Sequence, residues 1–101
     1  MNMKDLQTSA RQAAELMKAL SSENRLLLLC QLADGEKTVG ELADSLNLRQ
    51  AAVSQQLALL RKDGLVAPRR DGQTIYYSLA RGDISELMRF LHKTYCPADR
   101  A

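Results

Sequence analysis

The chain has 101 residues, of which 46% are hydrophobic and 26% charged, and its net charge at pH 7 is +2. This composition is typical of a globular domain, and the length suits one domain rather than two. No apolar run approaches the roughly 18 residues that a membrane-spanning helix needs. The polar start MNMKDLQTSARQ also lacks the apolar core of a signal peptide. We therefore expect one domain over residues 1–101, located in the cytoplasm and not bound to a membrane.

Positive charge is unevenly distributed along the chain. Residues 1–48 carry five Lys or Arg against seven Asp or Glu, and residues 82–101 carry three of each kind. Residues 49–81 carry six against two, a net charge of +4. Such a local excess is typical of a surface that meets phosphate groups. A solvated surface with uneven charge would give the same pattern, so charge alone does not identify the partner.

The first part of the chain is predicted to form two helices. Apolar residues at helical spacing predict one helix from about Ser9 to Leu20. A second helix is predicted to begin near Ser22 and to end near Gly35. The leucine run 26–29 within it indicates burial on more than one side.

A recognition motif is predicted over residues 38–62, beginning with a short helix and a tight turn. Thr38 and Glu41 have the spacing of a capping box, in which each side chain bonds the other residue's backbone amide. Asn47 and Leu48 follow the apolar face of this helix and are predicted to make the turn. The pattern is that of the first half of a helix-turn-helix.

The second helix of the motif is predicted from about Gln50 to Lys62. Val53, Leu57 and Leu60 lie within a narrow arc at about 100° per residue. The residues expected to face DNA are small or polar: Arg49, Gln50, Ala51, Ser54, Gln55, Gln56 and Ala58. Small residues let the backbone enter the major groove, while Ser and Gln can hydrogen-bond base edges. An ordinary surface helix would more often carry Lys and Glu here, so the pattern favours a recognition helix.

A β-hairpin, or wing, is predicted over residues 65–79. Asp71-Gly72 is a tight-turn signal, and the returning strand is predicted at 74–79. Beside the turn lie Arg69, Arg70 and Gln73, which we expect to contact phosphates or a minor groove. The alternative is that these basic residues only protect the edge of a sheet.

The last helix is predicted to open with a capping box formed by Asp83 and Glu86. Its apolar stripe consists of Ile84, Leu87, Met88, Leu91 and Tyr95. A small domain cannot cover so apolar a terminal helix, so we expect packing against the first helix and against a second subunit. A two-fold dimer would present two recognition helices to two DNA half-sites. Packing within a single chain is the alternative.

Four segments together resemble the ArsR/SmtB family of bacterial repressors: SSENRLLLLCQL, TVGELADSLNL, RQAAVSQQLALLRKDGLV and DGQTIYYSL. The resemblance extends over about residues 10–97. It implies a mainly α winged helix-turn-helix, with five helices and one β-hairpin wing, that forms a homodimer through its first and last helices. It also implies a repressor that binds double-stranded operator DNA and leaves when a signal is sensed. Gln56 departs from the family, which very often has His there, and this difference bears on base preference rather than on fold.

The family's commonest signal is a metal ion, but its ligand positions are mostly lost in this chain. Residues 38–42 read Thr-Val-Gly-Glu-Leu where one family site has Cys-Val-Cys-Asp-Leu. At the other site, Asp83, Cys96 and Asp99 keep some ligand character, while Ser85 stands in place of an imidazole. One thiol and two carboxylates make a poor zinc site. We therefore expect no metal and no other cofactor.

Two cysteines point to a different signal. Cys30 lies in LLLLCQL and Cys96 in TYCP, and this pair resembles the persulfide- and redox-sensing subgroup of BigR, SqrR, HlyU and YgaV types. The resemblance implies that both are regulatory thiols, and that reactive sulfur species crosslink them and weaken operator binding. A lasting structural disulfide is not expected in a reducing compartment. A metal-responsive repressor, a general thiol oxidant sensor and inert cysteines stay open as alternatives.

Two other classes of protein fit this sequence less well than a DNA-binding regulator does. A thiol enzyme built on Cys96 and His92 would need oxyanion donors, and none is indicated; the chain also lacks a Gly-rich phosphate loop. We therefore expect no enzymatic activity. A protein-interaction domain on a winged-helix scaffold would lack salt-dependent DNA affinity.

Overall fold

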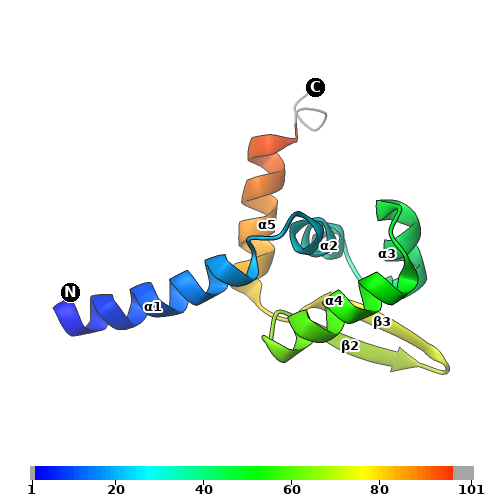
Figure 1. Ribbon diagram of the computed structural model, residues 1–101, viewed down its shortest axis with the longest axis horizontal. Helices are drawn as coiled ribbons and strands as arrows, with labels where there is room; N and C mark the ends of the chain where they lie inside the picture. Colours follow the sequence, from blue (N-terminus) through cyan, green and yellow to red (C-terminus); the bar gives the residue numbers. More distant parts are fainter. Residues whose placement is uncertain (1, 97–101) are drawn as a thin grey trace.

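The structure is a computed structural model and describes residues 2–96. Within them the order of elements is α1 (Met3–Ala19), α2 (Glu23–Ala33), β1 (Lys37–Thr38), α3 (Val39–Leu46), α4 (Gln50–Lys62), β2 (Val66–Asp71), β3 (Thr74–Leu79) and α5 (Gly82–Tyr95). The predicted five helices and hairpin wing are confirmed, and Figure 1 shows α3 and α4 beside the hairpin. None of the helices in this range is long and apolar enough to span a bilayer.

The hydrophobic core joins α2, α3, α4 and α5. The side chains that lose all solvent contact include Leu28 and Leu29 of α2, Leu42 of α3, Val53, Leu57 and Leu60 of α4, and Ile84 and Met88 of α5. The leucine run of α2 therefore supplies the centre of the core, as its sequence predicts. Burial of each such side chain stabilises the fold by about 1.5–3 kcal/mol.

Helix α1 begins earlier than the sequence predicts and packs loosely. The expected start was about Ser9, whereas the helix begins at Met3, because the Asn2 side chain accepts a hydrogen bond from the amide of Asp5 at 2.8 Å. No residue of α1 is buried. Figure 1 shows α1 reaching away from the rest of the molecule, with the N-terminus at its far end.

The wing is a three-stranded antiparallel sheet in the order β1-β3-β2. The hairpin pairs Val66 with Leu79 and Asp71 with Thr74, so its loop has two residues. Gly72 is the first of them and has a φ of +65°, a conformation that favours glycine. The predicted turn is thus confirmed. The third strand, β1, adds two residues along β3 and was not predicted, because two residues are too few to show an alternating pattern.

The predicted capping box of α5 is wrong. The helix begins at Gly82, and the residue before it, Arg81, makes no side-chain cap hydrogen bond. The Asp83 carboxylate instead pairs with the guanidinium of Arg81, with Nε and Oδ1 3.0 Å apart. Because Arg81 engages this carboxylate, the local pattern that suggested a box forms an ion pair instead.

Candidate functional site

The turn between α3 and α4 is built by local hydrogen bonds. Thr38 Oγ1 accepts from the amide of Glu41 at 3.1 Å, and the Glu41 carboxylate accepts from the amide of Thr38 at 2.9 Å, which confirms the predicted capping box. Asn47 ends α3 in the left-handed conformation, with a φ of 55°. The amide of Leu48 then donates to the carbonyl of Ala43 at 2.9 Å. Together these bonds set the direction in which α4 leaves the turn.

Helix α4 buries one face and exposes the other. Val53, Leu57 and Leu60 are fully buried. The exposed residues include Arg49, just before the helix, and Gln50, Ala51, Ser54 and Gln55 within it. Five of the predicted DNA contacts are therefore exposed to solvent, together with Leu59, a large apolar side chain that is 39% exposed.

Gln56 differs from the other predicted contacts, because it is half-buried and held by α2. Arg25 Nε donates to Gln56 Oε1 at 3.0 Å, and Arg25 Nη1 donates to the carbonyl of Ala19 at 3.1 Å. One guanidinium thus links the end of α1, helix α2 and the candidate recognition helix. Sequence reasoning missed Arg25, although a charged residue directly before a leucine run is a visible signal. A DNA contact by Gln56 stays a prediction.

Arg69 and Arg70 lie on opposite faces of the wing, since neighbouring strand residues alternate. Arg69 makes a two-point ion pair with Glu36, with nitrogen–oxygen distances of 2.8 and 2.9 Å, and its guanidinium lies 4.9 Å from the centre of the Tyr76 ring. The hydrogen bonds from Arg69 lower the pKa of Glu36. Arg70 and Gln73 are exposed. Both guanidinium groups are therefore exposed on the wing; that of Arg69 is held in position by Glu36, and that of Arg70 is not.

The two cysteines, both free thiols, lie where α2 meets α5. Cys30 is half-buried in α2, and its Sγ lies 3.7 Å from Met88 Sδ of α5. Cys96 follows the last turn of α5, and its amide donates to the carbonyl of His92 at 2.9 Å. Burial raises the pKa of Cys30, and negative charge on Cys96 and Asp34 raises it further. The two thiols are therefore close enough for the charge of one to affect the other.

A cavity of about 500 Å³ opens beside Cys30. Its lining comes from α2, the residue after it and α5, and consists of Cys30, Ala33, Asp34, Met88, Arg89, His92 and Lys93. The Cys30 thiol can be reached from solvent through this cavity. Among residues 2–96, no three His, Cys, Asp or Glu side chains gather in a way that would hold a metal ion. Asp99, one of the ligand positions considered above, lies outside the described residues.

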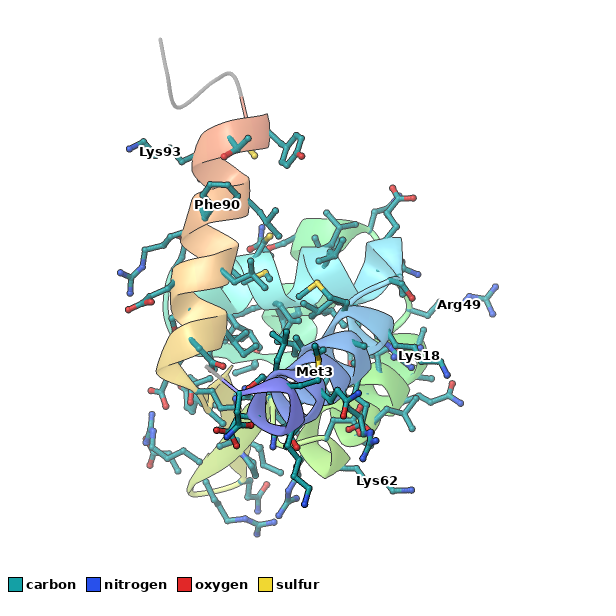
Figure 2. The ribbon with its side chains drawn as sticks, turned by 90° about the vertical axis from the view of Figure 1, so that its left-hand side faces the viewer. Met3, Lys18, Arg49, Lys62, Phe90 and Lys93 are labelled. Carbon is teal, nitrogen blue, oxygen red and sulfur yellow. The ribbon has the colours of Figure 1, made fainter. Side chains whose placement is uncertain are left out.

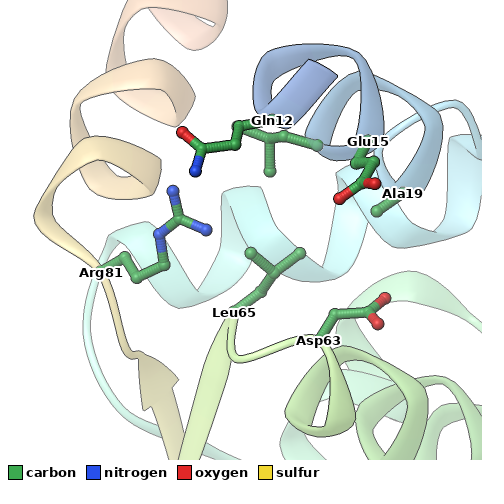
Figure 3. A pocket seen from close by; sticks show the side chains of 7 residues that line it. Gln12, Glu15, Ala19, Asp63, Leu65 and Arg81 are labelled. Carbon is green, nitrogen blue, oxygen red and sulfur yellow. The ribbon is translucent and has the colours of Figure 1, made fainter. Parts of the chain in front are cut away.

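A second hollow, of about 450 Å³, lies beneath α1. Figure 3 shows Gln12, Glu15 and Ala19 of α1 facing Asp63, Leu65 and Arg81 across it; Leu16 completes the lining. It contains no thiol, and its charged groups carry both signs. Its position reflects the loose packing of α1 on its own chain.

Comparison with known proteins identifies the group to which this architecture belongs. Residues 22–67 match the model of the "Bacterial regulatory protein, arsR family". The transcriptional activator HlyU of Vibrio cholerae is 42% identical over 99% of this chain and 93% of its own. The biofilm growth-associated repressor of Xylella fastidiosa is 36% identical over 99% of this chain and 88% of its own.

Solved structures agree with these matches. The reduced form of Vibrio cholerae HlyU superimposes with a TM-score of 0.87 at 41% identity, over 93% of this chain and 99% of that one. A homodimeric winged helix-turn-helix DNA-binding domain from Mycobacterium bovis superimposes with a TM-score of 0.76 at 30% identity, over 93% of this chain and 86% of that one. These similarities confirm the predicted fold class and a regulator rather than an enzyme.

Proposed function

The chain belongs to the arsR family of bacterial transcriptional regulators, and we propose that it binds operator DNA as a homodimer and is released when reactive sulfur species modify Cys30 and Cys96. The single observation that carries the sensing part is a pair of free thiols on α2 and at the end of α5: Cys30 Sγ lies 3.7 Å from Met88 Sδ of α5, and negative charge on Cys96 raises the pKa of Cys30. The relatives named above bear both activator and repressor names. We favour repression, the expectation drawn from the family.

The surface proposed to bind DNA combines the exposed face of α4 with the wing. Ser54 and Gln55 offer hydroxyl and amide groups for base edges in the major groove. Arg49 and Arg70 are exposed cations placed before α4 and on β2, where phosphates flank a bound helix. Residues 49–81 also carry the net charge of +4.

The dimer proposal is supported by an apolar seam on α1. Met3, Leu6, Ala10, Ala13 and Met17 recur at alternating spacings of three and four residues, and all five are exposed. This is the spacing with which two helices pack side by side. Phe90 of α5 is 61% exposed, and Figure 2 shows it on the same side of the molecule as Met3. A second copy of the chain would cover both surfaces, and the Mycobacterium bovis domain is described as homodimeric.

The proposed sensing step is sulfur transfer. A cysteine thiol loses its proton and attacks the outer sulfur of a persulfide, RS–SH; the sulfur–sulfur bond of the donor breaks and RSH leaves with the proton. The product is a protein persulfide. The other cysteine then attacks the protein-bound sulfur and displaces HS⁻, which leaves a disulfide between Cys30 and Cys96. If both cysteines first become persulfides, their condensation expels H₂S and leaves a bridge with one additional sulfur.

A crosslink between α2 and α5 has a short route to the DNA-binding surface. Cys30 shares α2 with Arg25, and Arg25 hydrogen-bonds Gln56 in α4 at 3.0 Å. A shift of α2 would therefore be transmitted to α4. In a dimer, the two recognition helices must match successive major grooves about 34 Å apart, so a small change in their separation lowers affinity.

The experiment follows intact mass and operator binding after treatment of the reduced protein with glutathione persulfide, hydrogen peroxide or zinc. We expect persulfide to consume both thiols and release DNA, with whole sulfur atoms added in the protein persulfide and in the bridge that keeps one additional sulfur. Cys96→Ser should bind DNA as the wild type does, but persulfide should no longer release it from DNA. Release of Cys96→Ser by persulfide would remove Cys96 from the mechanism. Loss of two hydrogens with peroxide would indicate a general oxidant sensor, and zinc bound to unmodified thiols would indicate a metal sensor.

A further inference from the structure

The cavity beside Cys30 has an apolar wall and a cationic wall. Ala33 and Met88 supply apolar surface. The other wall comes from α5, where Arg89 and Lys93 supply the cations and His92 lies between them in sequence. Arg89 and Lys93 are four residues apart, so they are neighbours on the helix surface. Both are exposed, and neither forms an ion pair within residues 2–96. Among the lining residues within the range 2–96, Asp34 is the one carboxylate, so Arg89 and Lys93 give this part of the lining a net positive charge.

This cavity stays accessible in the proposed dimer. At about 100° per residue around α5, Met88 and His92 lie about 160° from Phe90, Arg89 lies about 100° from it and Lys93 about 60°. Phe90 and α1 form the side that a second copy would cover, whereas the cavity opens between α2 and α5. Figure 2 shows Lys93 pointing away from the molecule at its edge and Phe90 on the face toward the viewer. The part of the cavity lined by Cys30, Met88 and His92 therefore lies away from the side that a second copy would cover, and Lys93 lies between the two sides.

We propose that this cavity is an anion-binding site that selects the sulfur donor, holding a carboxylate of an acidic low-molecular-weight persulfide on Arg89 and Lys93 while its outer sulfur meets Cys30. The inference rests on the proposed sulfur-sensing function. Cys30 would be the first sulfur acceptor, because its side chain lines the cavity. Its Sγ bonds to the outer sulfur, and the displaced thiol leaves with the proton that Cys30 gives up.

Two properties of the site suit a binding step before sulfur transfer. The cavity volume of about 500 Å³ lies in the range of small-molecule sites. Burial disfavours the thiolate of Cys30, so unassisted collisions with small oxidants react slowly. A donor held against the thiol gains from proximity, which offsets this disadvantage. Neutral hydrogen peroxide gains nothing from the cations, so the same site would discriminate against it.

The test measures second-order rate constants of sulfur transfer to the reduced chain by intact mass. Glutathione persulfide carries two carboxylates, whereas cysteamine persulfide carries an ammonium group and no carboxylate. We expect Arg89→Gln/Lys93→Gln to slow the first donor by at least about fivefold but not to slow the second, because the two cations repel its ammonium group. Added NaCl should slow the first donor in the wild type, since salt screens the cations.

The matched control is Arg61→Gln/Lys62→Gln, which removes the same charge from exposed residues of α4 that do not line the cavity. It should react with glutathione persulfide as the wild type does. An equal loss in the control would mean that overall charge acts, and no loss in the cavity variant would mean that the cations do not bind the donor. Either result overturns the site.

A second readout separates this inference from the proposed function. S-methylglutathione, which cannot transfer sulfur, should protect Cys30 of the wild type from iodoacetamide in a saturable way, but not Cys30 of the cavity variant. Absence of this protection would refute the anion site even if persulfides still modify the protein. Protection without any sulfur transfer from persulfides would refute the sensing function and leave the anion site standing.

Discussion

At the scale of single residues, the surroundings of Cys30 govern its chemistry. The thiol is half-buried against Met88, and burial is the largest cause of its raised pKa, followed by negative charge on Cys96 and Asp34. A thiolate is the reactive form of cysteine. Cys30 at neutral pH therefore reacts slowly unless a donor is held beside it.

This environment predicts the pH dependence of Cys30 alkylation. In Cys96→Ser the charge of Cys96 is gone, but burial and Asp34 still favour the neutral thiol. The rate with iodoacetamide should therefore rise with pH and reach its midpoint above that of a free thiol, about 8.5. Glutathione in the same buffers is the control. A midpoint for Cys30 at or below that of glutathione would show that the thiol is not disfavoured as described.

Arg69 is a second residue whose contacts affect its proposed role in DNA binding. It is held by Glu36 and lies beside the Tyr76 ring. Exposed ion pairs contribute only about 0–1 kcal/mol. We therefore expect that a DNA phosphate can take the place of Glu36 at little cost, as the proposed DNA contact of Arg69 requires.

At the scale of elements, α4 separates a structural face from a face available for contact. Val53, Leu57 and Leu60 hold the helix on the core, and Gln56 is held by Arg25. Gln55 is exposed and makes no such hydrogen bond to any residue in the range 2–96. Among the glutamines near the middle of α4, Gln55 is thus the better candidate for reading a base.

We predict that Gln55→Ala weakens operator binding by about 1–3 kcal/mol relative to random DNA, because one base contact is lost. Affinities for both DNAs, measured at several salt concentrations, test this. Arg70→Ala is the control, since loss of a phosphate contact should weaken both DNAs alike and reduce the salt slope by about one. Equal losses of Gln55→Ala on both DNAs would exclude a base-reading role.

At the scale of the whole molecule, a single copy of the chain leaves large apolar side chains of α1 and α5 uncovered. Helix α1 has no buried residue, a hollow lies beneath it, and Met17 and Phe90 are 51% and 61% exposed. In a single chain, this 17-residue helix contributes little to stability, because it buries none of its own residues and leaves apolar side chains in solvent. The arrangement becomes favourable when a second copy covers the seam.

We predict that Met17→Glu makes the protein monomeric at micromolar concentration and lowers operator affinity by at least tenfold, roughly 1.4 kcal/mol. A charge in the apolar seam has no partner there, while the core is untouched. Sedimentation velocity reports the mass, and circular dichroism reports the helices. Thr8→Glu is the control, because Thr8 is exposed on the opposite side of α1. A dimeric Met17→Glu would contradict the assignment of this seam.

Elements whose signals are local could be predicted from the sequence. The capping box of Thr38 and Glu41, the turn at Asn47 and the hairpin loop at Gly72 were all predicted, because each depends on atoms only a few residues apart. The buried face of α4 was predicted for the same reason: a periodic pattern specifies a face before its partner is known.

Contacts between residues far apart in the sequence could not be predicted in this way. Arg25 and Gln56 are 31 residues apart, Glu36 and Arg69 are 33 apart, and Cys30 and Met88 are 58 apart. Each contact depends on how two elements pack, which no local spacing encodes. The same packing opened the cavity beside Cys30. The ion pair of Asp83 with Arg81, two residues before it, is by contrast a local contact that the capping pattern did not predict. The sequence thus indicated that a thiol pair was present, whereas packing determined what surrounds it.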